Sequence, residues 1–183
     1  MKSLQGQLLI SSPQLTDPNF ARSVVLIVQH NEEGALGLIL NRPLETSMQD
    51  VWEQVSEAPC ETDSSLYQGG PCEGPLMAIH ALESLAQMEV VEGVYFSTDR
   101  EAFEELVSHD REDAKFFVGH AGWSPGQLEE EIESGAWLAS PARPKDVFST
   151  GEELWTKLRR AISLRTTFPW LDPKRIPDDP TVN

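Results

Sequence analysis

Two apolar runs joined by a short polar link constrain the fold of this chain more than any other feature. Residues 24–28 and 36–40 are uninterrupted apolar stretches, and the link over 31–34 ends in glycine. The first run is rich in β-branched side chains, which predicts a strand buried on both faces. The glycine-ended link predicts that the two strands form a β-hairpin. Polar residues follow each strand, and a site would be built at such strand ends.

The remaining sequence alternates between strand and helix patterns. Further strands are predicted over 4–11, 75–81, 89–96 and 114–119, with a short extended piece from Trp137. Capping patterns start helices at 46–49, at Ser97 or Thr98, at 124–127 and at 150–153. Pro43 is expected to end the second strand of the hairpin. Intermingled strands and helices predict a mixed α/β class.

The length of 183 residues suits one domain, and the sequence shows no internal repeat and no linker. We therefore expect a single domain over residues 1–165. Four prolines and little apolar content follow Phe168. Residues 166–183 are accordingly predicted to be a peripheral or poorly ordered tail.

The formal net charge of −16 is distributed unevenly. Residues 1–43 are balanced, and residues 45–99 contain acidic side chains but no Lys or Arg. The sequence has one basic cluster: Lys157, Arg159, Arg160 and Arg165. An acidic protein repels phosphate groups, so direct binding to nucleic acid or to anionic membranes is not expected. The charge suits a basic protein partner.

Neither a membrane segment nor a cofactor is expected. The longest apolar runs are of strand length, and the N-terminus has no signal-peptide pattern, so a cytoplasmic location is predicted. Cys60 and Cys72 lack metal-ligand spacing and are interpreted as two unrelated thiols. The oligomeric state is left open.

Polar residues at the hairpin ends are the first candidates for a site. His30 could act as a general base or a hydrogen-bond donor, although a histidine that merely ends a strand is the favoured interpretation. Arg42, beside Asn41, could clamp a carboxylate or phosphate, or pair with an acidic neighbour. Arg22 is more simply interpreted as half of a structural ion pair.

Two glycine-containing segments are the second set of candidates. Gly69 and Gly70 precede a proline and indicate a sharp bend, or a place where a backbone or ligand approaches closely. Gly122, Trp123 and Gln127 lie where a strand ends and a helix begins, and helix N-termini attract anions. The acidic residues 129–131 crowd that helix start and favour a plain capped helix. Since no catalytic motif occurs, enzymatic activity has no positive support.

The ordered motifs of the chain resemble the YqgE/AlgH family of bacterial proteins. They are Gln5-Gly6, Asp17-Pro-x-Phe20, Arg22-Ser-Val-Val25, His30, Gly34-Ala-x-Gly37, Leu40-Asn-Arg-Pro43, Gly69-Gly-Pro71 and Gly119-x-Ala-Gly-Trp123 with Gly126-Gln-Leu-Glu129. The resemblance covers residues 4–160 and implies a bifurcated mixed sheet, folded into a partial barrel with helices outside. It implies no settled activity, although members are often called putative transcriptional regulators. His120 and Cys72 depart from the usual residues of the family.

Three functions follow, in order of preference. The first is a non-enzymatic regulatory or protein-interaction role with a basic partner. The second is a small-anion-binding protein or enzyme whose pocket brings together His30, Arg42 and Trp123. The third is direct DNA binding, which the charge disfavours and for which no helix-turn-helix pattern occurs.

Overall fold

The computed structural model describes residues 2–151 and 153–167. Most of the predicted tail, residues 168–183, therefore lies outside the described residues, while residues 166 and 167 belong to the last helix. None of the helices in the described part of the chain is long and apolar enough to cross a membrane.

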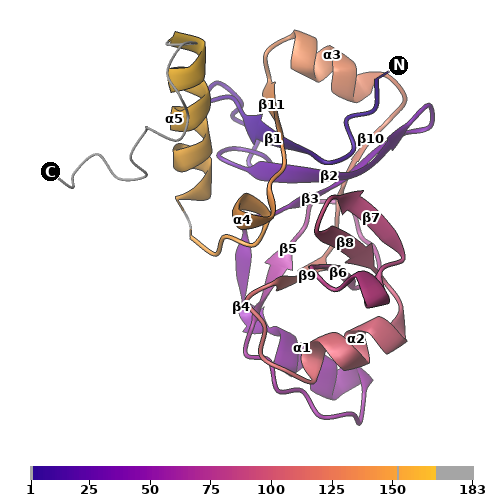
Figure 1. Ribbon diagram of the computed structural model, residues 1–183. Helices are drawn as coiled ribbons and strands as arrows, with labels where there is room; N and C mark the ends of the chain where they lie inside the picture. Colours follow the sequence, from indigo (N-terminus) through magenta and orange to yellow (C-terminus); the bar gives the residue numbers. More distant parts are fainter. Residues whose placement is uncertain (1, 152, 168–183) are drawn as a thin grey trace, which may run out of the picture.

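Two β-sheets form the centre of the molecule (Figure 1). The first sheet is antiparallel and has the order β10-β3-β2-β1-β11, with β1 Gln7–Ser11, β2 Val24–Asn31, β3 Gly34–Ile39, β10 Ala121–Trp123 and β11 Trp137–Pro141. The second has the order β4-β5-β9-β6-β8-β7, with β4 Pro43–Ser47, β5 Ser65–Gln68, β6 Met77–His80, β7 Met88–Val91, β8 Val94–Ser97 and β9 Ala114–Val118. It is mixed, because β5 and β9 are parallel.

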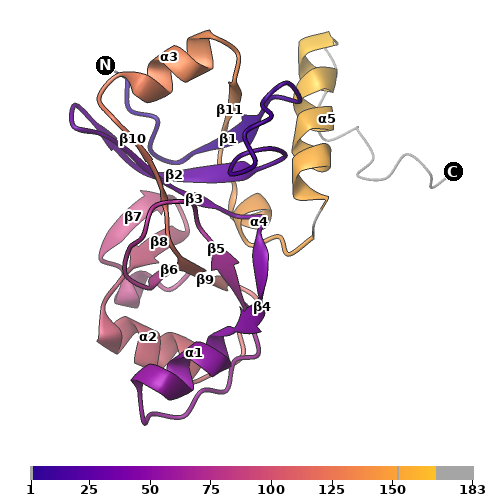
Figure 2. The same ribbon diagram turned by 180° about the vertical axis from the view of Figure 1, so that it is seen from behind.

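Helices cover the outer faces of this pair of sheets. The α-helices are α1 Met48–Val55, α2 Arg100–Val107, α3 Gln127–Glu133, α4 Pro144–Val147 and α5 Leu154–Thr167, with a 3-10 turn, η1, at Glu83–Leu85. Helices α1 and α2 lie beyond the second sheet and α3 beyond the first, while α5 runs along the side next to β1 (Figures 1 and 2). The layers are therefore helix, sheet, sheet, helices.

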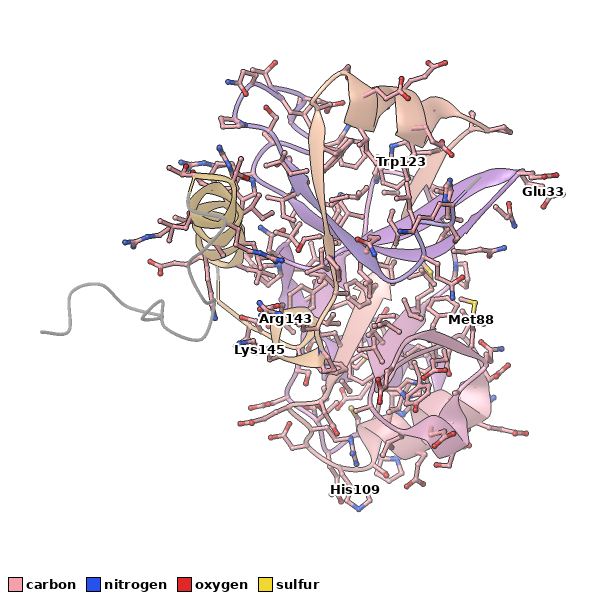
Figure 3. The ribbon with its side chains drawn as sticks, turned by 45° about the horizontal axis from the view of Figure 1, so that its top comes forward. Glu33, Met88, His109, Trp123, Arg143 and Lys145 are labelled. Atoms are coloured by element: carbon pink, nitrogen blue, oxygen red, sulfur yellow. The ribbon has the colours of Figure 1, made fainter. Side chains whose placement is uncertain are left out.

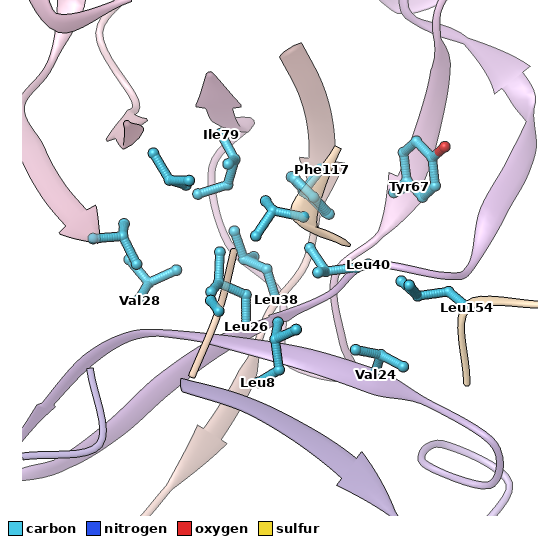
Figure 4. Close-up of a cluster of buried hydrophobic side chains, with 14 of the residues drawn as sticks. Leu8, Val24, Leu26, Val28, Leu38, Leu40, Tyr67, Ile79, Phe117 and Leu154 are labelled. Atoms are coloured by element: carbon cyan, nitrogen blue, oxygen red, sulfur yellow. The ribbon is translucent and has the colours of Figure 1, made fainter. Parts of the chain in front are cut away.

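Alternating side chains of the hairpin fill two different cores. Leu26 and Leu38 point toward the second sheet, where they meet Ile79 and Phe117 in the central core (Figure 4). Their odd-numbered neighbours, such as Ile27, point to the opposite face and pack under α3. Strand β2 is thus buried on both faces, as its continuous apolar sequence predicts.

The two sheets branch from each other where glycines let two backbones touch. Gly69 lies between the sheets, since its N–H donates to Val118 O of the second sheet and its carbonyl accepts from Ile39 N–H of the first. A Cβ atom on Gly69 would lie 2.2 Å from Gly119 O, and one on Gly70 would lie 2.2 Å from the carbonyl carbon of His120. Gly69 and Gly70 are therefore not a plain bend: they are required by the crossing of β5 with the β9–β10 connection.

The prediction of a mixed α/β fold with a branched sheet and flanking helices is confirmed, and the sheets do not close into a barrel within the described residues. Local boundaries differ from prediction. The stretch 89–96 is a hairpin, β7–β8, whose turn has Gly93 at φ +76°. Pro43 starts β4 rather than only ending the preceding strand.

Three helix starts also differ from prediction. The N-cap of α2 is Asp99, not Ser97 or Thr98. The capping box of α1 is formed by Ser47 and Asp50, one residue later than the pattern at 46–49 suggested. Helix α3 begins at Gln127 after Gly126, which has φ +78°, so Ser124 is not its N-cap. Neighbouring polar side chains compete to cap the same backbone N–H groups, and the one that succeeds sets where the helix starts.

Candidate functional site

His30 is buried between the N-terminal segment and α3. Its side chain is 1% exposed, and its Nδ1 accepts a hydrogen bond from the Leu4 N–H at 2.9 Å. The ring proton is therefore on Nε2, which lies 3.0 Å from Glu129 Oε1. This contact is close but not aligned, because neither oxygen of Glu129 has a hydrogen bond of good geometry within the described residues. Both ring nitrogens face protein groups, so His30 joins three segments.

Trp123 and Gln127 hold α3 onto the first sheet through one carboxylate. Glu131 Oε2 accepts the indole N–H of Trp123 at 2.9 Å and that of Trp137 at 2.8 Å. Glu131 Oε1 accepts from Gln127 Nε2 at 2.9 Å, and Gln127 Oε1 accepts the Ser124 N–H at 3.0 Å. Figure 3 shows Trp123 below α3. The helix start predicted to attract an anion is thus engaged by the chain's own side chains. We call these four side chains the indole clamp.

Asn41, Arg42 and Arg22 shape the turn that leads into β2. Asn41 accepts the Val24 N–H and donates to Arg22 O, each at 2.9 Å. Arg42 donates to Ala21 O at 3.2 Å, and burial lowers its pKa while nearby Asp17 partly opposes that shift. Arg22 has φ 56° and places its guanidinium 5.4 Å from the centre of the Trp155 ring. All three residues brace backbone or pack on an aromatic ring.

The candidate residues do not gather in one place. In the β2–β3 register His30 pairs with Ala35, whereas Val25 pairs with Ile39 near the start of β2. At about 3.3 Å per residue, the two ends of β2 are roughly 20 Å apart. His30 and Trp123 lie at one end and Arg42 follows the other, so the expected convergence of these three does not occur. Gly122 pairs with Leu36 on the edge strand β10.

Lys115 is a buried amine that sequence reasoning missed. It is 2% exposed, and its Nζ donates to Leu40 O at 3.1 Å and to Ser149 O at 2.5 Å. The ammonium also lies 4.7 Å from the centre of the Tyr67 ring. Burial lowers the pKa of Lys115 to about 7. In the sequence Lys115 is a single polar position in an apolar strand. Whether its side chain is buried depends on which segments pack against that strand, and the sequence does not show them.

The low pKa of Lys115 makes stability depend on pH. In the unfolded chain the amine binds a proton up to about pH 10.4, so between pH 7 and 10 the unfolded state holds more protons. The contribution of Lys115 to stability therefore rises with pH in that window, by up to ~1.4 kcal/mol per unit. Relative to Lys115→Met, we expect the wild type to gain about 2 kcal/mol in urea unfolding between pH 7.5 and 9.5. Lys145→Met, at an exposed position, is the control; parallel pH profiles for wild type and Lys115→Met would contradict this.

His80 and Ser97 form a second buried pair. His80 Nε2 lies 3.0 Å from Ser97 Oγ, and His80 Nδ1 accepts the Leu82 N–H at 3.3 Å. The Ser97 hydroxyl in turn donates to Leu85 O at 2.5 Å. Because the serine proton is directed to a carbonyl, the imidazole is not placed to remove it. Burial lowers the pKa of His80, which favours the neutral imidazole and suits a structural role.

Cys72 and His120 are opposite each other in an isolated antiparallel bridge. Their backbones exchange two hydrogen bonds of 2.9 Å, and the Cys72 side chain is exposed. No group of three or more His, Cys, Asp or Glu side chains in the described part of the chain could hold a metal ion. Both cysteines are free thiols.

Two adjoining hollows on the surface lie over α1 and α2, away from every residue predicted for a site. One, of about 230 Å³, is lined mainly by apolar side chains, and we call it the apolar groove: Trp52, Val55, Ser56, Pro75, Leu76, Thr98, Arg100 and Phe103. A second, the acidic hollow, adjoins it and shares Val55, Ser56 and Arg100. It is otherwise lined by Glu53, Gln54, Glu57 and Ala58.

Nearly all of the net charge lies on the half of the molecule that contains these hollows. Residues 44–113, the acidic lobe, comprise α1, α2 and most of the second sheet. They contain 17 acidic and two basic side chains, a net charge of −15, against −16 for the whole chain. The exposed basic residues of α5 lie on the other half, beside β1 (Figure 1).

Comparisons with known proteins agree on one family. A family model described as AlgH-like matches residues 8–166. A UPF0301 protein of Streptomyces avermitilis is 35% identical, covering 100% of this chain and 97% of the relative, and a UPF0301 protein of Chlorobaculum tepidum is 37% identical over 85% of each. The solution structure of the AlgH protein from Pseudomonas aeruginosa matches with a TM-score of 0.71 and 29% identity over 94% of both chains. The crystal structure of protein DIP2367 from Corynebacterium diphtheriae matches with a TM-score of 0.68 and 28% identity, over 91% of this chain and 88% of that one. The chain therefore belongs to the AlgH-like family, as its sequence motifs indicated.

Proposed function

We propose that this chain is a non-enzymatic interaction protein of the cytosol that exerts a regulatory role by binding a basic protein partner through its acidic lobe. The observation that carries the proposal is the segregation of charge. A net charge of −15 over 70 consecutive residues creates a field that attracts cationic surfaces and speeds their association. The same field repels phosphate backbones, so a regulatory effect would pass through protein contacts rather than through DNA.

The arrangement of the other candidate residues supports the same assignment. His30, Asn41, Trp123 and Gln127 are engaged in bracing the first sheet and α3. These structural roles explain much of the motif pattern, and no catalytic role is needed to explain it. The apolar groove and the acidic hollow, by contrast, lie on the acidic lobe.

The test is affinity purification from the native cell with matched charge variants. One variant neutralises four exposed acids of the acidic lobe: Glu53, Glu57, Glu101 and Glu105, each changed to Gln. The control neutralises four exposed acids elsewhere: Glu32, Glu33, Glu130 and Glu133. We expect at least one basic protein to bind the wild type and the control at moderate salt and to be lost from the first variant. A purification with no such protein, or equal recovery on both variants, would overturn the proposal.

A further inference from the structure

The floor of the apolar groove is made by two stacked aromatic rings. Trp52 of α1 and Phe103 of α2 have ring centroids 6.4 Å apart and an interplanar angle of 21°. The indole N–H of Trp52 already donates to Ala58 O at 3.0 Å, so it has no need of another acceptor. Each of the two residues is only 3% exposed, so the floor offers a small apolar surface to whatever enters the groove.

Val55 forms a wall of the groove and is exposed to an unusual degree. It is 63% exposed in the last turn of α1, and Leu138 at 37% is the other large exposed apolar side chain of the described residues. Next to Val55 lie Pro75 and Leu76, which extend the apolar surface from a different segment. Apolar side chains that gather around a hollow mark a contact surface more than scattered single ones do.

The acidic hollow supplies charge directly beside this apolar surface. Glu53 receives a hydrogen bond from the uncharged amide of Gln49 at 3.1 Å. Across residues 2–151 and 153–167, neither Glu53 nor Glu57 forms an ion pair. The nearby guanidinium of Arg100 is paired with Glu104 at 2.8 Å. The two carboxylates are thus available to a cation from outside.

We propose that the apolar groove and the acidic hollow bind one short segment of a partner protein, in which an apolar anchor stands within about three residues of a Lys or Arg. This inference rests on the proposed function and specifies where and how the basic partner binds. The groove, at about 230 Å³, is smaller than the roughly 300–1,000 Å³ of small-molecule sites, so it suits one anchoring side chain. The hollows share a wall, and an extended segment advances about 3.3 Å per residue, which sets the short spacing between anchor and cation.

A random dodecapeptide library displayed on phage, selected on the intact protein, is the probe. We expect the enriched peptides to carry a leucine, isoleucine or aromatic residue within three positions of Lys or Arg. Synthetic fluorescein-labelled copies are then titrated with wild type and variants, and affinity is read from fluorescence anisotropy.

The variant Val55→Glu distinguishes apolar contact in the groove from electrostatic attraction to the acidic lobe. The change adds a negative charge, so an association driven by charge alone would tighten, whereas occupation of the groove predicts about tenfold weaker binding. Leu138→Glu adds the same charge at the other exposed apolar residue and should change affinity less than about twofold. The double variant Glu53→Gln, Glu57→Gln should weaken binding by about three- to tenfold at low salt.

The outcomes separate this inference from the proposed function. Basic peptides that bind Val55→Glu as tightly as wild type would overturn the groove while leaving the acidic lobe as the binding surface. Enriched peptides without Lys or Arg, or no enrichment at all, would overturn the two-part site. If the charge variants of the affinity purification also retain every partner, the proposed function fails with it.

Discussion

Replacing Gly70 by alanine is expected to abolish the native fold or to cost more than about 4 kcal/mol of stability. The new Cβ atom would lie 2.2 Å from the His120 carbonyl carbon and 2.3 Å from the Ala121 nitrogen. These are backbone atoms, so no side-chain rotation relieves the overlap. The strands would have to separate, which breaks the pair of hydrogen bonds between Cys72 and His120. Circular dichroism and urea unfolding measure the loss.

Gly151→Ala is the matched control for this change. A Cβ atom on Gly151 meets only the Glu153 nitrogen, at 3.9 Å, so the free energy of unfolding should stay within about 0.5 kcal/mol of wild type. A Gly70→Ala protein with a wild-type urea midpoint would show that the two sheets do not cross as described.

Removal of the carboxylate in the indole clamp is the second large expected effect. Glu131→Ala leaves the N–H groups of Trp123 and Trp137 without their acceptor, and those residues are only 6% and 2% exposed. An unsatisfied buried donor costs about 1–3 kcal/mol, so the loss should be about 3 kcal/mol in urea unfolding followed by tryptophan fluorescence. Amide hydrogen exchange in α3 should accelerate as well, because the helix loses its main polar attachment to the sheet.

Glu133→Ala removes an exposed carboxylate from the same helix and serves as the control. It makes no hydrogen bond to an indole within the described residues, and we expect a change below about 0.5 kcal/mol. If Glu131→Ala and Glu133→Ala were equally stable, the clamp would have no energetic role.

Sequence patterns were informative wherever the structure depends on neighbours along the chain. The apolar run of β2 and its glycine-ended link predicted the hairpin and its burial on both faces. The predicted start of α1 was wrong by one residue, because Ser47 and Asp50 form its capping box in place of the predicted pair. The sequence prediction also merged β7 and β8, whose two-residue turn hardly interrupts the apolar pattern.

The candidate site was predicted less well, since side-chain roles depend on partners distant in sequence. His30 contacts Glu129 almost a hundred positions away, and Lys115 donates to Leu40 O at a separation of 75. Gly69 and Gly70 looked like a bend because the strand that crosses them comes some fifty residues later. The apolar groove between α1 and α2 also depends on contacts between distant segments, and the sequence alone does not indicate it.

The sequence alone determined the mixed α/β class, the family and the acidic character, because composition, periodicity and ordered motifs are properties of the chain itself. Only the tertiary structure decided where these properties act. It formed an apolar groove on the acidic lobe, whose charge of −15 the sequence already shows. It also placed His30 and Arg42 at opposite ends of one hairpin. The physical reason is that charge and hydrophobicity are local, whereas a site is a meeting of side chains that only the packing of distant segments can arrange.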